Sequence, residues 1–98
     1  MSVYEFLEDE INECRDSLNW YDKNPTWKNA AYVALSRYAL ANAISFAMVK
    51  KYHDPEVRGL IDTANAVFAQ CDRIAQKVAA EMASEMEADE TAWLGEVV

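Results

Sequence analysis

The sequence predicts an all-α fold, an up-down-up bundle of three helices. Composition is the first indication: two glycines and two prolines in 98 residues are too few for the turns of a sheet protein. Apolar residues also recur at steps of three and four over long stretches, which is the period of a helix face. Short connections then place successive helices antiparallel. We expect one domain over residues 1–98, because this length fits a single core.

The first helix is predicted over residues 2–18. Ser2 and Glu5 have the spacing of a capping box, in which each side chain satisfies a free backbone N–H at the helix start. Apolar residues follow at steps of three and four, and acidic residues recur on roughly the opposite side. We expect residues 19–24 to form a loop. The apolar set is Val3, Leu7, Ile11, Cys14 and Leu18, and the acidic set, here called the acidic stripe, is Glu5, Asp9, Glu13 and Asp16.

The second helix is predicted over residues 25–51, with Asn24 as N-cap and Pro25 in the first turn. It has no clean polar face, so we expect it to be the central helix, buried on nearly all sides. Residues 30–49 are also long enough to span a bilayer. Arg37 near their middle would cost about 2.5–3.5 kcal/mol on insertion. The sequence therefore favours the buried helix of a soluble bundle, with a membrane span as the alternative.

The third helix is predicted over residues 55–88, followed by a tail at 89–98. Asp54 and Pro55 repeat the cap-then-proline start. At 1.5 Å per residue the helix would be about 50 Å long, so it should project beyond the much shorter first helix. Its apolar residues keep a seven-residue pattern: Val57, Ile61, Ala64, Phe68, Cys71, Ala75, Val78 and Met82.

Charge is segregated along the chain. Residues 1–22 carry seven acids and one base, residues 23–53 five bases and no acid, and residues 78–98 six acids and no base. The net charge of −8 argues against direct binding of nucleic acid. The bases at Lys28, Arg37 and Lys50 point to different sides of one helix and form no patch. We expect them to pair with acids of the two acidic arms.

Cys14 and Cys71 both occupy apolar positions of helical stripes. They are expected to be reduced core cysteines, although a disulfide that joins the first helix to the last remains an alternative. Residues 1–16 are acidic where a signal peptide needs a basic start and an apolar centre. A cytoplasmic location follows as an expectation, and disulfides are unusual there.

The chain carries no pattern typical of catalysis. His53 is the single histidine and stands in a predicted turn, far in sequence from either cysteine, so a zinc site is not expected. No glycine-rich loop exists to bind phosphate, and no Glu-x-x-His pair exists to bind iron. We therefore predict a protein that is not an enzyme and needs no metal or cofactor.

A binding protein is the hypothesis that remains. Carboxylates one helical turn apart lie about 5–6 Å apart, close to the spacing of phosphates on a nucleic-acid strand. An acidic face could thus engage a basic surface of a larger protein, with exposed aromatic residues as further contacts. A solvated helix face and capping of the bundle ends are the structural alternatives. The candidate acidic residues are Glu5, Asp9, Glu13, Asp16, Glu81, Glu85 and Asp89, and the candidate aromatic contacts are Trp20, Tyr21, Trp27 and Trp93.

Small acidic chains without catalytic motifs resemble in character the inhibitors encoded by phages and other mobile elements, including some anti-CRISPR proteins. No motif of such a family matches any stretch, so the resemblance assigns no residue a role. The alternative function is structural: a homodimeric helical bundle acting as a regulatory or assembly subunit. A second copy would then cover the apolar second helix and the projecting end of the third.

Overall fold

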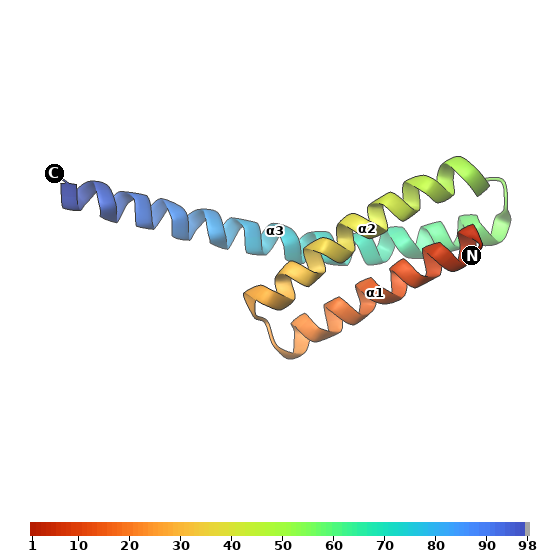
Figure 1. The fold of residues 1–98 in the computed structure, drawn as a ribbon, viewed down its shortest axis with the longest axis horizontal. Helices are drawn as coiled ribbons and strands as arrows, with labels where there is room; N and C mark the ends of the chain where they lie inside the picture. Colours follow the sequence, from red (N-terminus) through yellow and green to blue (C-terminus); the bar gives the residue numbers. More distant parts are fainter. Residues whose placement is uncertain (98) are drawn as a thin grey trace.

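The protein folds as an all-α bundle of three helices, as the sequence predicts. The computed structural model describes the backbone of residues 1–97 and the side chains of residues 1–84. The helices are α1 (Val3–Lys23), α2 (Trp27–Lys51) and α3 (Pro55–Val97). They run up, down and up again, and each packs against both of the others (Figure 1).

Short polar side chains set the helix starts. Ser2 Oγ accepts a hydrogen bond from the Glu5 N–H at 3.1 Å, and Thr26 Oγ1 accepts one from the Asn29 N–H at 3.2 Å. The Asp54 carboxylate accepts one from the Glu56 N–H at 2.9 Å, next to Pro55. The expected caps at Ser2 and Asp54 are confirmed.

The predicted loop at residues 19–24 is wrong over most of its length, because α1 continues to Lys23. Tyr21 follows Leu18 by three residues and packs against the core, so the apolar face of α1 extends one more turn. Asn24, expected to cap α2, instead ends α1 by donating its N–H to the Trp20 carbonyl at 3.0 Å. The cap of α2 is Thr26.

The core lies along the line where the three helices meet. Its members come from the stripes predicted in α1 and α3 and from one side of α2. Each fully buried Leu, Ile or Val contributes about 1.5–3 kcal/mol through loss of apolar surface to water. The core residues are Leu7, Ile11, Cys14, Val33, Leu40, Ala43, Ile44, Ala47, Val57, Ile61, Ala64, Val67 and Cys71.

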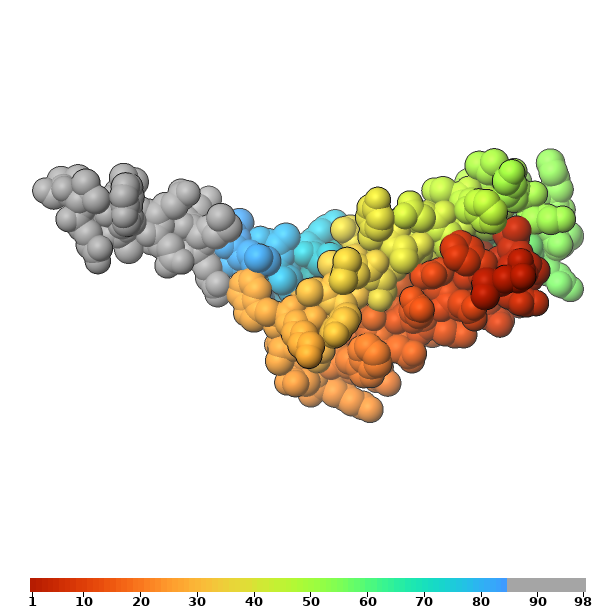
Figure 2. Space-filling view, in the orientation of Figure 1, coloured from red at the N-terminus to blue at the C-terminus, as the bar shows by residue number. Residues whose placement is uncertain are grey.

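The expectation that α2 is buried on nearly all sides is wrong. In a bundle of three, each helix has two neighbours, and these cover only part of its circumference. Side chains on the opposite side of α2 face outward: Leu35, Tyr38 and Val49 are 67%, 69% and 81% exposed. In Figure 2 the surface of α2, coloured yellow to green, lies open beside α1.

The predicted projection of α3 is present, and it is longer than expected because the helix runs to Val97 and not to residue 88. The molecule is accordingly 63 Å long and only 28 by 20 Å across. Met82 is the last described side chain that lines a cavity together with α2. We call residues 83–97, which continue past the ends of α1 and α2, the overhang (Figure 1).

Among residues 1–97, α2 is the one helix that is long and apolar enough to cross a membrane, with a mean hydropathy of 1.2. Arg37 lies within it and forms an ion pair with Asp72 of α3, with Arg37 Nη1 2.6 Å from the carboxylate. This pairing corrects the expectation that Arg37 would meet the acidic arms, because Asp72 belongs to neither arm.

Candidate interaction site

The acidic stripe lies along the outer side of α1. All four of its residues are exposed, while Leu7, Ile11 and Cys14, which alternate with them in sequence, are buried against the other helices. The separation follows from the helical period, which sends the two sets to opposite sides. The ion pair between Arg37 and Asp72 is the only one among residues 1–84, so no stripe carboxylate there is neutralised by a base.

The C-terminal half of the stripe opens on a recess between α1 and α2. Glu13 and Asp16 line it from α1 together with Trp20, and Tyr32 lines it from α2. Its volume is about 250 Å³, and the hydroxyls of Ser17 and Ser36 form its floor, 2.7 Å apart. We call this recess the acid–aromatic notch.

Two aromatic rings form one wall of the notch. The Trp20 and Tyr32 ring centroids are 6.0 Å apart with an interplanar angle of 72°, an edge-to-face pair. Trp20 is 51% exposed, and Tyr32 is 42% exposed. Two carboxylates and two accessible aromatic rings therefore face the same small volume.

The other predicted contact residues lie elsewhere. Tyr21 is partly buried against the core, and Trp27 lies at the start of α2. Both line a narrow cavity together with Glu81, which is exposed, and none of the three lines the notch. The structure thus brings Trp20 to the acidic stripe and leaves Tyr21, Trp27 and Glu81 apart from it. The side chains of Glu85, Asp89 and Trp93 lie outside the described residues.

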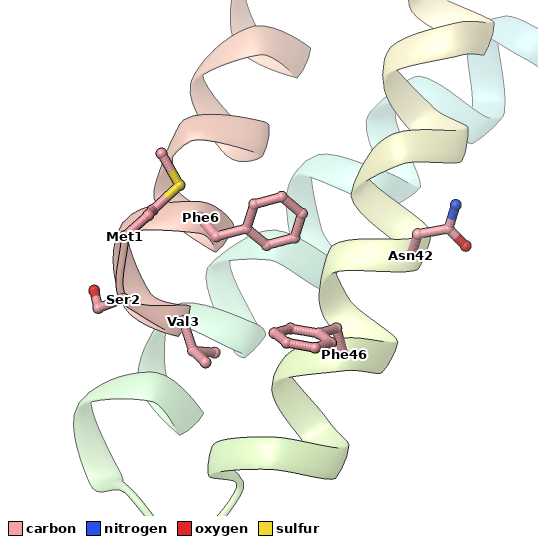
Figure 3. Close-up of a pocket in the computed structure, with 6 residues that line it drawn as sticks. All are labelled: Met1, Ser2, Val3, Phe6, Asn42 and Phe46. Carbon is pink, nitrogen blue, oxygen red and sulfur yellow. The ribbon is translucent and has the colours of Figure 1, made fainter.

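A larger apolar recess lies at the other end of the α1–α2 pair. Val3 and Phe6 face Phe46 across it, and the two phenyl centroids are 6.1 Å apart at 78° (Figure 3). Its volume is about 500 Å³, and Asn42 is a polar residue on its rim. No titratable side chain lines it, so its chemistry is that of apolar contact.

One layer of the interior is polar. The Cys14 thiol donates to the Ser36 carbonyl oxygen at 3.1 Å, beside the Ser17–Ser36 hydroxyl pair. Cys71 of α3 is a neighbour of Cys14, and both cysteines are free and fully buried. Interaction with the neighbouring Cys71 thiol, followed by burial, raises the pKa of Cys14, so this thiol stays protonated. The predicted core position of both cysteines is confirmed, and no disulfide joins them in this structure.

Arg37 and Glu10 are titratable groups close to this layer. Arg37 Nε is buried and has no hydrogen-bond partner among the described residues, and neither has Glu10 Oε2. Burial, followed by the neighbouring carboxylates of Glu13 and Asp9, raises the pKa of Glu10.

Residues 1–84 contain no group of three or more His, Cys, Asp or Glu that could hold a metal ion.

Tyr32 and Ser17 belong to the notch but were not among the predicted site residues. In sequence, Tyr32 is one of many apolar residues of α2. Its ring lies beside Trp20 because of the orientation in which α2 packs on α1. Ser17 directly follows Asp16, and no spacing signal marks its partner on α2.

Comparison with protein-family models, curated proteins and solved structures found no match for this chain.

Proposed function

We propose that this protein acts by contact with another protein, as a non-enzymatic acidic binding protein that engages a basic surface of a larger partner. The observation that carries the proposal is the acid–aromatic notch. There the exposed carboxylates of Glu13 and Asp16 share one recess with the half-exposed rings of Trp20 and Tyr32. Tryptophan and tyrosine are enriched among the residues that contribute most to protein interfaces, and carboxylates at the rim attract a basic partner.

An arginine side chain of the partner fits this chemistry best. Its guanidinium group donates to carboxylates and stacks on aromatic faces at the same time, whereas a lysine ammonium group is a compact, strongly hydrated charge. A cation over an exposed aromatic ring contributes about 0.5–1 kcal/mol, and more when water is excluded. Glu5 and Asp9 lie further along α1, so they would speed the approach of the partner without occupying the notch.

A surface that normally holds nucleic acid is the form of partner we favour. Stripe carboxylates separated by one helical turn are about 5–6 Å apart, which approaches the spacing of phosphates. The lack of ion pairs on the stripe within residues 1–84 leaves its negative field intact. An inhibitor of the kind that mobile elements encode would use such a face to occupy a nucleic-acid channel.

The test is binding of a fluorescent ten-arginine peptide to the full chain, followed by anisotropy over a series of salt concentrations. We expect Trp20→Ala and Asp16→Asn each to weaken binding by about 3- to 10-fold. Rising salt should weaken binding of the unaltered protein. A ten-lysine peptide of equal charge should bind less tightly, because lysine cannot stack in the notch.

Asp62→Asn is the matched control, because Asp62 is an exposed carboxylate on α3. It removes the same charge as Asp16→Asn and should leave the affinity within about 2-fold. Equal weakening by Asp62→Asn and Asp16→Asn would reduce the interaction to net charge and remove the notch from the proposal.

A further inference from the structure

The outward side of α2 carries a stripe of mostly apolar residues, interrupted by Asn42, that α1 and α3 leave largely exposed. Its residues follow one another at steps of four and three, the spacing that places side chains along one line of a helix. All of them are exposed. This outer stripe consists of Ala31, Leu35, Tyr38, Asn42, Phe46 and Val49.

The outer stripe continues onto α1. Asn42 and Phe46 belong both to the stripe and to the apolar recess that Val3 and Phe6 line from α1 (Figure 3). The apolar surface therefore reaches from the middle of α2 to the start of α1. Large contiguous apolar patches on soluble domains mark contact sites, whereas single exposed apolar residues need no explanation.

The overhang has the length and the charge to cover this surface. Its 15 residues extend about 22 Å, and the 25 residues of α2 extend about 37 Å. Residues 83–97 carry five acids and no base. The helix α2 carries no acid, and three of its four bases, Lys28, Lys50 and Lys51, are exposed at its two ends. The two elements complement each other in charge but cannot meet within one chain, because α3 leads the overhang away from α2 (Figure 1).

We infer that a second copy of this chain covers the outer stripe, with the overhang of each copy lying along α2 of the other. A two-fold axis makes the two contacts equivalent, so the interface closes on itself and forms no filament. Specific interfaces bury about 800 Å² on each partner. The contact of one overhang with one α2 would bury less than that area. The two-fold axis supplies two such contacts, which doubles the buried area. The acidic stripe of α1 takes no part, so this inference goes beyond the proposed function.

The first test is the mass of the full chain in solution, measured by light scattering after size-exclusion chromatography. We expect a dimer for the unaltered protein. Leu35→Glu and Val49→Glu should each weaken dimerisation at least 10-fold, because they place a carboxylate in the contact. Both side chains are well exposed, so helicity by circular dichroism should not change. Asp62→Lys, an exposed change on α3, is the control and should leave the dimer intact.

The second test exchanges the charges of the two elements. Lys50→Glu with Lys51→Glu should weaken the dimer, as should Glu87→Lys with Glu90→Lys. All four substitutions together should restore dimerisation to within about 3-fold of the unaltered protein. Such a rescue requires the overhang to lie close to the end of α2, which a loss of folding would not produce.

Four results would overturn the inference. A monomer at several hundred micromolar would exclude the second copy. A dimer that withstands Leu35→Glu would exclude the outer stripe as the contact surface. A failed charge exchange would exclude the overhang as the part that covers it. Binding of the monomer to anionic lipid vesicles that Leu35→Glu abolishes would assign the stripe to a membrane instead. Asp16→Asn should not alter the dimer mass, so failure of the peptide-binding test and failure of this one are distinguishable.

Discussion

The two sides of α2 are similarly apolar in sequence, but one side is buried and the other is exposed. Val33, Leu40 and Ala47 lie on the inward side and are fully buried, whereas Leu35, Tyr38 and Val49 lie on the outward side and are mostly exposed. Both sides are apolar, so hydrophobicity does not distinguish them. The difference is that α1 and α3 both pack on the inward side.

The inward side of α2 therefore holds the bundle together, and the outward side is left for contact with a partner. The inward side contributes the apolar burial that offsets the entropy of folding. The outward side contributes little to the stability of an isolated chain, and its value lies in a contact with another molecule. Equivalent changes on the two sides of α2 should therefore differ widely in their effect on stability.

Leu40→Ala should have the largest effect, a loss of about 3 kcal/mol from the free energy of unfolding. Leu40 is fully buried between the helices, and truncation leaves a cavity as well as a loss of apolar contact. Leu35→Ala makes the same chemical change on the outward side and should cost less than about 0.5 kcal/mol. Urea denaturation at one low protein concentration measures both. Similar losses at the two positions would abolish the distinction between the two sides.

Oxidation of Cys14 and Cys71 should stabilise the bundle by about 2 kcal/mol, because a disulfide would tie α1 to α3 across roughly 57 residues. Both thiols lie in the core and are close enough for each to shift the pKa of the other. Oxidised glutathione should convert them slowly, since both are fully buried and exchange requires local opening. Loss of two hydrogens by mass spectrometry, together with a higher melting temperature, checks this. Mixed disulfides with glutathione on separate sulfurs would show that the thiols do not meet.

The sequence predicted those features that depend on neighbours along the chain. The stripe of Leu7, Ile11 and Cys14 could be read directly, because one helix period places all three on one side. The caps at Ser2 and Asp54 could be read as well, since a cap and its partner lie within three residues. The end of α1 was missed because polar residues near Asn19 suggested a loop, while Tyr21 kept the apolar period going.

Features that depend on how the helices are placed could not be read in the same way. Composition shows which sides of α2 could be buried, but the number of neighbouring helices decides which are. The acidic half of the notch, Glu13 and Asp16, was predicted, whereas Tyr32 was not, because its proximity to Trp20 depends on how α1 and α2 pack. For the same reason, the sequence could offer the proximity of Cys14 and Cys71 only as an alternative.

Asp72→Ala should cost about 1 kcal/mol. It removes the partner that fixes Arg37 on the inward side of α2, and the pair is about one-third exposed, so solvent weakens it. Asp62→Ala removes an exposed carboxylate from the same helix and should change the free energy of unfolding by less than about 0.3 kcal/mol. Thermal unfolding of both variants gives the comparison. If both cost the same, the ion pair does not contribute to holding α2 against α3.

Glu10→Gln should have the smallest effect, a slight gain in stability at neutral pH. Burial and the carboxylates of Glu13 and Asp9 raise the pKa of Glu10 above its ordinary 4.5, so the folded state holds this proton more tightly than the unfolded state. Ionisation of Glu10 therefore lowers the stability of the fold as the pH rises. The loss begins near the unfolded-state pKa of 4.5 and is complete above the raised pKa of the folded state. The advantage of Glu10→Gln should be absent at lower pH, appear across that window and then level off. Melting temperatures from pH 3.5 to 7.5 measure it, with the exposed neighbour change Glu8→Gln as control. An advantage equally large at pH 3.5 would show that shape, and not ionisation, sets the effect.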